Sequence, residues 1–333
     1  MQRRKLGQAE TSVSAIGYGA MSLTHFYGPI DADESDIVLR KVLDLGIDHI
    51  DTSNVYGAGL SEERIGAFLA KQGQQKDNTF KIATKAGITR NDDGERVFDN
   101  SAAHLGESLD KSLKRMGVDH VELFYVHRRE AARPIEEVTE TLAGFIKAGK
   151  IRQFGFSEIA PTSLAVAHSV HPVGAVQSEY SLSTRSPEMG LVQRTAELGT
   201  SLVAFCPVGR SLLTDTPHDF EKSQNIDFLK SNPRFLEPNL SRNIEATVAF
   251  RALAKDMGTS AAALAMAWLL HQGEHILPIP GTRSVEHLEQ LAAGAELKLT
   301  PTNLADIDRV LPIGWAHGDR YNVGQWNGPE KYC

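Results

Sequence analysis

Apolar and polar residues repeat along this chain with two alternating periods. Short apolar runs, which are typical of strands buried in a parallel sheet, occupy residues 14–19, 49–52, 80–85, 121–127, 152–157, 174–179, 201–206 and 275–280. Between them, apolar residues stand three and four positions apart, as in amphipathic helices. In 36–46, Ile37, Val38, Val42 and Leu45 share one face, and Gly46 stands where a C-terminal cap is expected. Further helices are predicted at 62–71, 101–116, 135–148, 162–169, 188–198, 259–271 and 285–295, with an additional one at about 243–257.

Eight strands, each followed by a helix, with no break in composition, predict a single-domain α/β protein, a (β/α)8 TIM barrel spanning residues 1–333. A doubly wound sheet is the competing fold. Its glycine fingerprint is incomplete here, because GYGAMS at 17–22 lacks the third glycine. Two long segments remain: a loop at 207–242 after the seventh strand, and a C-terminal tail at 311–333 that we expect over the barrel mouth.

Composition excludes several classes of protein. The chain has 333 residues, 41% hydrophobic and 23% charged, with a net charge of -7, and no basic cluster suggests nucleic-acid binding. No segment has the ~20 consecutive apolar residues of a membrane span. Two cysteines, Cys206 and Cys333, provide no disulfide framework, so a cytoplasmic location is expected. No set of three metal ligands is apparent, so no metal site is predicted.

Four ionisable residues stand at or just after the ends of successive predicted strands. Asp51 ends the second strand and Tyr56 follows in its loop, while Lys85 ends the third strand and His127 the fourth. Because the active site of such a barrel lies where strands end, these side chains should meet at one mouth. Each residue alone has an ordinary structural explanation, such as a solvated terminus, a cap or packing. Together they form a chemically coherent set.

The set suits proton transfer to a carbonyl oxygen. An ordinary phenol, with a pKa near 10, is a poor acid at neutral pH. A neighbouring ammonium is expected to lower the pKa of the Tyr56 phenol, and a carboxylate to keep that lysine charged and aimed. A histidine can hydrogen-bond and orient the carbonyl. No group in the set supplies electrons, so a hydride donor must lie beside it.

At these residues the chain resembles the aldo-keto reductase family over nearly its full length. The matching motifs, in order, include IGYGAMSL, HIDTSNVYG, IATKAG, VELFYVHR, GKIRQFGFSE, VQSEYSL, VAFCPVGRSLL and ILPIPGTRS. They are most similar to the branch with a short fourth-strand loop and a PIPGTR motif in the eighth strand. The resemblance implies that Asp51, Tyr56, Lys85 and His127 are a catalytic tetrad with Tyr56 as the general acid. It also implies an extended nicotinamide cofactor across the mouth, and a substrate held by Phe26, Tyr27, Tyr56 and His127.

The resemblance also implies a set of cofactor contacts. Ser157, Glu158 and Gln177 would bind the carboxamide, and Phe205 would stack on the nicotinamide. The segment from Cys206 through Pro207, Val208 and Gly209 to Arg210 would cover the pyrophosphate. Further contacts are implied for Gly19, Ala20, Met21, Asp51, Ile279, Gly281, Arg283, His287 and Gln290. Gln290 and Leu291 stand where the family usually has Glu-Asn, which puts the adenine contacts in doubt.

Independently of the resemblance, a helix N-terminus with glycine and free backbone amides at 281–291 predicts an anion site. Arg283 adds a planar donor suited to a 2′-phosphate, which favours NADPH/NADP⁺ over NADH. The predicted function is therefore NADPH-dependent reduction of a small-molecule aldehyde or ketone. Three alternatives stay open: an alcohol dehydrogenase running oxidatively with NADP⁺, a channel-type regulatory subunit that retains a nucleotide site, and an aldolase using Lys85 as a Schiff base. A monomer is the default expectation.

Overall fold

The computed structural model describes residues 1–332, without the side chain of Asp77. Cys333, the last residue of the predicted tail, lies outside the described residues. Eight strands form one parallel sheet in the order β12-β11-β10-β9-β8-β5-β4-β3. Their bounds are β3 Tyr18–Gly19, β4 His49–Asp51, β5 Lys81–Ala86, β8 Val121–Val126, β9 Ile151–Ser157, β10 Ala175–Glu179, β11 Ser201–Phe205 and β12 Ile276–Pro278.

Backbone hydrogen bonds close this sheet into a barrel. Gly17 N donates to Pro278 O and Gly19 N to Pro280 O, both at 2.9 Å, which joins the first and last strands. A Cβ on Gly19 would lie 2.8 Å from Ile279 O, so a residue without a side chain is needed at this seam. The predicted (β/α)8 barrel is confirmed.

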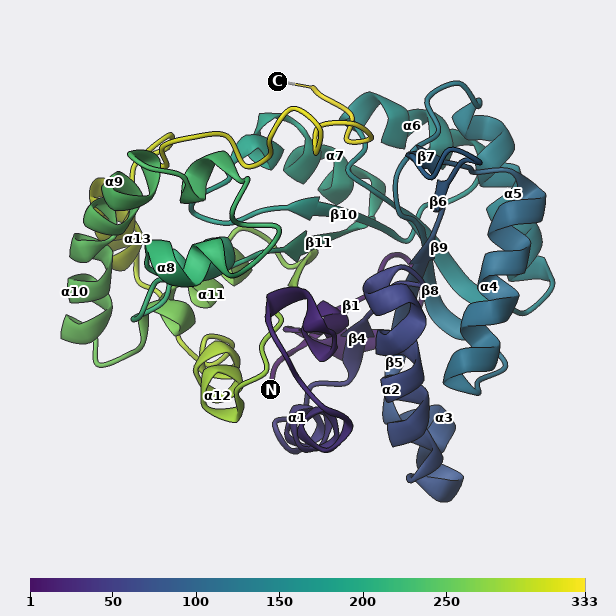
Figure 1. The fold of residues 1–333 in the computed structure, drawn as a ribbon, viewed down its shortest axis with the longest axis horizontal. Coiled ribbons are helices and arrows are strands. Elements are labelled where there is room, and N and C mark those ends of the chain that lie inside the picture. The colour runs from purple at the N-terminus through teal and green to yellow at the C-terminus, as the bar shows by residue number, and fades with distance from the viewer. Residues whose placement is uncertain (333) are drawn as a thin grey trace.

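Helices surround the sheet, and the bottom of the barrel is covered by a hairpin (Figure 1). The hairpin consists of β1 Arg3–Lys5 and β2 Ser12–Ser14. The helices are α1 Ala32–Asp44, α2 Leu60–Ala70, α3 Lys76–Thr79, α4 Ala102–Met116, α5 Ile135–Lys147, α6 Pro161–Val170, α7 Leu191–Leu198, α8 Phe220–Gln224, α9 Asn239–Ala246, α10 Val248–Asp256, α11 Ala261–His271, α12 Val285–Ala293 and α13 Pro301–Val310. Capping residues fix the N-termini of several helices: Asp31 and Glu34 form a capping box on α1, and Ser101 caps α4.

Three buried apolar clusters result: one inside the barrel, one between the sheet and the helices, and a smaller one in which Ala15 and Ile16 pack against α11 and α12. The inner core includes Leu123, Ala175, Val203 and Leu277, with Leu6 packing from the hairpin side. The outer core is larger and takes one face from nearly every helix. In α1 that face is Val38, Leu39 and Val42, whereas Ile37 is 58% exposed, so its predicted place on the buried face was wrong.

Some predicted boundaries differ from the structure. Residues 14–19 are not one strand, because Ser14 ends β2 of the bottom hairpin and β3 begins only at Tyr18. The predicted loop 207–242 contains the short α8, a 3-10 turn at Pro233–Phe235 and the beginning of α9. The predicted helix 243–257 is divided at Thr247, whose hydroxyl donates to the carbonyls of Asn243 and Ile244.

Several elements were not predicted, among them the strand β1 and the short helix α3. A hairpin of β6 Ile88–Arg90 and β7 Arg96–Phe98 follows β5, and α13 precedes the tail. Beyond α13, the chain from 311 to 332 runs past α7 toward α6 along the top edge of the molecule (Figure 1). Trp315 Nε1 donates to Leu182 O at 2.8 Å, and Glu330 accepts from Ala160 N at 2.8 Å. These contacts hold the tail against the loops that follow β9 and β10.

Candidate active site

Asp51 and Lys85 form a buried ion pair at the carboxyl ends of neighbouring strands. β4 pairs with β5 in parallel, with Asp51 beside Ala83, so Lys85 stands two residues further toward the mouth. The side chains of Lys85 and Asp51 are 0% and 2% exposed. Lys85 Nζ donates to an Asp51 carboxylate oxygen and, at 2.8 Å, to Thr52 O. A buried lysine with such partners is held in one position.

Tyr56 reaches this pair through a tight turn after β4. Asn54 N donates to Lys85 O at 3.2 Å and Tyr56 N donates to Ser53 O at 3.1 Å, which folds the loop back toward β5. Gly57 follows with a φ of 59°, a left-handed conformation that glycine adopts without steric cost. The Tyr56 hydroxyl oxygen then lies 3.4 Å from Lys85 Nζ.

His127 completes the group from β8. Its backbone N donates to Ala86 O at 2.8 Å, and its ring lies edge-on to the Tyr56 ring with centroids 5.8 Å apart. Nδ1 is 3.0 Å from Ser53 Oγ. Burial lowers the pKa of His127 well below its usual value, and the charges of Arg128 and Lys85 lower it further. The imidazole is therefore neutral at pH 7.

The pKa of Tyr56 moves opposite to the sequence expectation. Burial raises it, the Asp51 carboxylate raises it further, and Arg128 opposes the rise. Burial also lowers the pKa of Lys85, against the stabilising charge of Asp51. Because the Lys85–Asp51 pair is nearly neutral as a unit, the ammonium gives Tyr56 little net charge stabilisation. Tyr56 thus keeps its proton at neutral pH.

The three residues predicted to hold the carboxamide lie at the ends of β9 and β10. Gln177 Nε2 donates to the second oxygen of Asp51 at 2.7 Å, and Ser157 Oγ accepts from Arg128 at 2.9 Å. Glu158 instead accepts from Glu179 N at 2.9 Å and pairs with Arg320 of the tail. Ser157 and Gln177 therefore face the tetrad, whereas the Glu158 carboxylate is engaged in a different network.

That network is a buried cluster of five charged residues, here called the tail cluster: Glu158, Glu179, Arg210, Arg234 and Arg320. Glu179 accepts from Arg210 twice, at 3.0 and 2.7 Å, and lies 3.6 Å from Arg234 and 3.7 Å from Arg320. Burial alone would raise the pKa of Glu179, but the three arginines lower it to about 2. Sequence reasoning missed Glu179, Arg234 and Arg320, since no periodic signal links these distant segments.

The loop after β11, predicted to cover a pyrophosphate, has an unusual backbone. Cys206 and Arg210 have φ values of 51° and 54°, and Gly209 has 58°. Non-glycine residues in this region are strained, and such loops are often held ready for a ligand. Arg210, whose guanidinium pairs with Glu179, braces the loop from beneath. Burial raises the pKa of the Cys206 thiol to about 11, so it is no nucleophile at pH 7.

Arg283 lies at the start of α12, beside the chain that follows β3. Its guanidinium donates to Pro29 O, and a Cβ on Gly28 would lie 3.0 Å from it. Ser284 caps α12 by accepting from His287 N at 3.2 Å. The pKa of His218 falls to about 4 through burial first, then Lys222 and, more weakly, Arg283 and His287. Lys222 and Arg283 both act on His218, so positive charge lies near this helix N-terminus, where a phosphate would bind.

The remaining predicted contacts line the same end of the barrel. Ala20 and Met21 belong to a 3-10 turn that continues β3, and Phe26 and Tyr27 to the next turn. Burial raises the pKa of Tyr27, Cys206 and Tyr56 raise it further and the charge of Arg210 lowers it, so these groups are neighbours. Phe205 ends β11 and packs against the inner core. Ile279 is buried, whereas Gly281 and His287 are exposed and Gln290 is half-buried.

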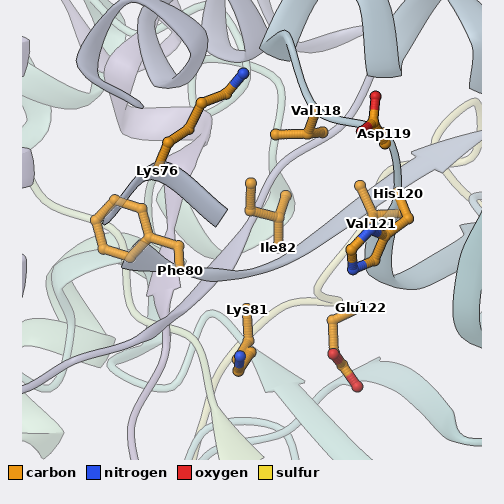
Figure 2. A pocket seen from close by; sticks show the side chains of 9 residues that line it. All are labelled: Lys76, Phe80, Lys81, Ile82, Val118, Asp119, His120, Val121 and Glu122. Carbon is orange, nitrogen blue, oxygen red and sulfur yellow. The ribbon is translucent and has the colours of Figure 1, made fainter. Parts of the chain in front are cut away.

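A separate pocket lies at the opposite end of the barrel (Figure 2). It is lined by the starts of β5 and β8, including Lys81, Ile82, Val121 and Glu122. Amino ends of barrel strands are the face that maintains stability, while carboxyl ends carry chemistry. None of the four tetrad residues borders this pocket.

Similarity to known proteins now identifies the class. The model of the aldo/keto reductase family matches residues 15–312, and the chain belongs to that family. It is 36% identical over 328 residues to aldo-keto reductase yakc of Schizosaccharomyces pombe, whose name specifies NADP(+), covering 96% of this chain and 94% of that protein. The chain is 34% identical over 334 residues to probable aldo-keto reductase 1 of Glycine max, covering 100% and 95%. The prediction of an NADP-linked oxidoreductase is confirmed at the level of the family.

Solved structures give the same fold. A glycerol dehydrogenase from Gluconobacter oxydans superimposes with a TM-score of 0.81 at 25% identity, over 93% of this chain and 94% of that one. An aldo-keto reductase from Bacillus halodurans, in its holo form, gives 0.78 at 24% identity over 98% and 99%, a likeness of fold alone. Within residues 1–332, no helix is long and apolar enough to cross a bilayer, and no group of three potential metal ligands converges.

Proposed function

We propose that this chain reduces an aldehyde or ketone to the alcohol, with Tyr56 donating the proton to the carbonyl oxygen. One observation carries the proposal: Lys85 Nζ, itself buried, bridges the Asp51 carboxylate and the Tyr56 hydroxyl. An ammonium that donates to the phenol oxygen leaves the phenol's own proton free to point outward, toward a substrate. The 3.4 Å contact is long, and such contacts tighten when substrate binds.

The other residues have supporting roles. Neutral His127 is anchored through Nδ1 near Ser53, so Nε2 is available to donate to the substrate oxygen. Asp51 keeps Lys85 charged and is itself fixed by Gln177. Two donors, Tyr56 and His127, would thus converge on one oxygen where negative charge develops.

NADPH, when bound, supplies the hydride. The residues present fit it: Ser157 retains a hydroxyl proton to donate to the carboxamide, and the strained loop from Cys206 to Arg210 can cover the pyrophosphate. The Arg283 guanidinium at the start of α12 fits the 2′-phosphate that distinguishes NADPH from NADH. The name of the S. pombe relative supports the same cofactor.

The protonation state of Tyr56 bears on the direction of the reaction. At neutral pH the phenol is protonated, which is the form that a reduction consumes. Oxidation of an alcohol needs the phenolate, so its rate should increase with pH. The similarity to a glycerol dehydrogenase makes that oxidation the second candidate.

The test is NADPH consumption, followed by absorbance, with a panel of aldehydes and ketones. We expect turnover by the native protein and a loss of about 10³-fold in kcat for Tyr56→Phe. NADPH affinity, measured by fluorescence titration, should stay unchanged. The matched control is Tyr180→Phe, which removes a phenol that binds Glu188 away from the tetrad. If Tyr56→Phe turned over at the native rate, Tyr56 would not be the acid.

A further inference from the structure

Arg128, the residue after His127, has no acidic partner. Its Nη1 donates to His127 O at 2.7 Å and to Ser157 Oγ at 2.9 Å, while its Nε is buried without a hydrogen-bond partner. Within residues 1–332, apart from the undescribed Asp77 side chain, no carboxylate forms an ion pair with this guanidinium. A partly buried charge that lacks a counter-ion is costly, so its retention calls for an explanation.

Arg96, an exposed residue on the β6–β7 hairpin, is a second cation near Arg128. It lies over the Phe98 ring at 5.3 Å and pairs with no carboxylate in the described part of the chain. A Cβ on Gly328 of the tail would lie 2.7 Å from the Phe98 ring and 3.2 Å from Arg128, so hairpin, tail and Arg128 meet at this point. Burial lowers the pKa of Arg96, and repulsion from Arg128 lowers it further.

The contrast with the tail cluster is informative. Arg210, Arg234 and Arg320, at the same end of the barrel, all lie within 4 Å of a buried glutamate carboxylate. On the side of the mouth formed by β8 and the β6–β7 hairpin, by contrast, Arg128 and Arg96 lie near each other, and neither forms an ion pair with a carboxylate among the described residues. An anion that arrives with a ligand would supply the missing charge.

The phosphates of the cofactor are poorly placed to be that anion. The predicted pyrophosphate and 2′-phosphate contacts follow β11 and β12, and β12 is four strands from β8 in the eight-stranded ring. Arg128 lies instead beside the reaction centre, where its charge acts on both Tyr56 and His127. A substrate whose carbonyl oxygen sits between those two residues would extend past Arg128.

We propose that Arg128, assisted by Arg96, binds an anionic group of the substrate, a carboxylate or a phosphate a few atoms from the reacting carbonyl. This inference rests on the proposed reductase function and specifies its substrate class. Because Nη1 of Arg128 is engaged by His127 O and Ser157 Oγ, the N–H groups of Nη2 are the ones left to donate to either group.

The test compares matched substrates that differ in charge. One pair is 4-oxobutanoate and butanal, which contrasts a carboxylate with a methyl group; the other is glyceraldehyde 3-phosphate and glyceraldehyde. We expect kcat/KM to be at least about 10-fold higher for the charged member of one pair or both, as for a charge-assisted hydrogen bond. Which pair shows the larger ratio distinguishes a carboxylate from a phosphate ligand.

The variants measure the same ratio. Arg128→Gln should lower the charged-to-neutral ratio by about 10- to 100-fold, and Arg96→Gln by a smaller factor of about 3 to 10. Arg128→Lys keeps the positive charge but replaces the planar guanidinium with an ammonium, so it should retain part of the preference for the charged substrate. The control Arg152→Gln, exposed at the opposite end of β9, should leave the ratio unchanged. The charged-to-neutral ratio distinguishes an anion site from an indirect effect on the cofactor. A variant that merely misplaces the cofactor through Ser157 slows the reduction of both substrates equally and leaves the ratio unchanged.

Two failures would be distinguishable. If neutral aldehydes are reduced but the charged partners have no advantage, or if Arg128→Gln and Arg96→Gln leave the ratio unchanged, the anion site is wrong and the reductase stands. If no carbonyl compound consumes NADPH, the proposed function itself fails. Should Arg128→Gln not fold, the ratio in Arg96→Gln and its fall with added salt in the native protein decide the question.

Discussion

Two groups of buried charge lie at the same end of this barrel, and they differ in what the charge is available to do. The Asp51–Lys85 pair is flanked by Tyr56, a group that can exchange a proton with a substrate. The surroundings of the tail cluster differ: its carboxylates accept hydrogen bonds from arginines, from a backbone N–H and from the hydroxyls of Ser178 and Thr184, and one of those arginines comes from the tail. Burial of an ion pair is therefore not a signature of chemistry by itself. The hydrogen bond from Lys85 to the Tyr56 phenol is what distinguishes the two groups.

The largest expected effect comes from breaking the catalytic pair. Lys85→Met should lower kcat by about 10³-fold, equivalent to about 4 kcal/mol, because the Tyr56 oxygen loses its donor. It should also destabilise the protein by about 3–5 kcal/mol, since Asp51 is left buried and unpaired. Both are measured on one preparation, by steady-state rates and by urea unfolding.

The double variant Asp51→Asn/Lys85→Met separates the two losses. Because the double variant has no unpaired buried carboxylate, it should regain most of the stability that Lys85→Met loses, while its activity should stay low. Recovery of both would mean that the pair acts only through the fold, and the contrast with the tail cluster would disappear.

In the tail cluster, removing one charged partner of a buried ion pair should affect the stability of the protein alone. Glu179→Gln removes the charge that faces Arg210, Arg234 and Arg320, and we expect a loss of about 3 kcal/mol in the free energy of unfolding. The kcat of the variant that remains folded should stay within a few-fold of the native value. A 10³-fold fall in kcat in folded Glu179→Gln would show that this cluster, too, takes part in catalysis.

Lowering the pH should reproduce part of that loss in the free energy of unfolding of the native protein. The pKa of Glu179 is depressed from 4.5 to about 2 in the folded state, so its contribution is complete above about pH 4.5 and is lost as pH falls toward 2. The stability difference between native protein and Glu179→Gln should therefore be about 2 kcal/mol smaller at about pH 3 than at pH 7. Urea unfolding at both pH values checks this, and a difference independent of pH would contradict it.

The two groups also differ in how far the sequence predicts them. Asp51, Lys85 and His127 each stand at the end of an apolar run, and parallel strands bring such ends together, so local pattern was sufficient. Arg234 and Arg320 come from a loop and from the tail, where no period constrains their position, and their meeting with Glu179 is a property of tertiary packing. The pKa of Tyr56 was predicted in the wrong direction because burial and Asp51, not Lys85 alone, determine it.

Arg320→Gln tests the attachment of the tail with a smaller effect. The substitution removes the Glu158 pair and the stacking of the guanidinium on Tyr321 and Trp326, at 4.6 and 4.7 Å from the ring centres. We expect a loss of about 1–3 kcal/mol, with faster proteolysis within 311–332. Unchanged cleavage in the tail, measured by mass spectrometry of the fragments, would mean that Trp315 and Glu330 hold it without Arg320.

The smallest effect is expected at an exposed pair on α13. Arg309 Nη2 lies 2.9 Å from Asp306, and the two side chains are 69% and 34% exposed. Water screens such a pair and its side chains lose entropy in forming it, so Arg309→Gln should change the free energy of unfolding by less than about 0.5 kcal/mol. Arg309→Gln and Arg320→Gln make the same chemical change, the loss of one guanidinium charge, at an exposed and at a buried position. Arg309→Gln is therefore the matched control for the loss of charge alone. If urea unfolding gave equal losses for the two variants, burial would not be the property that makes the tail cluster stabilising, and net charge would explain both.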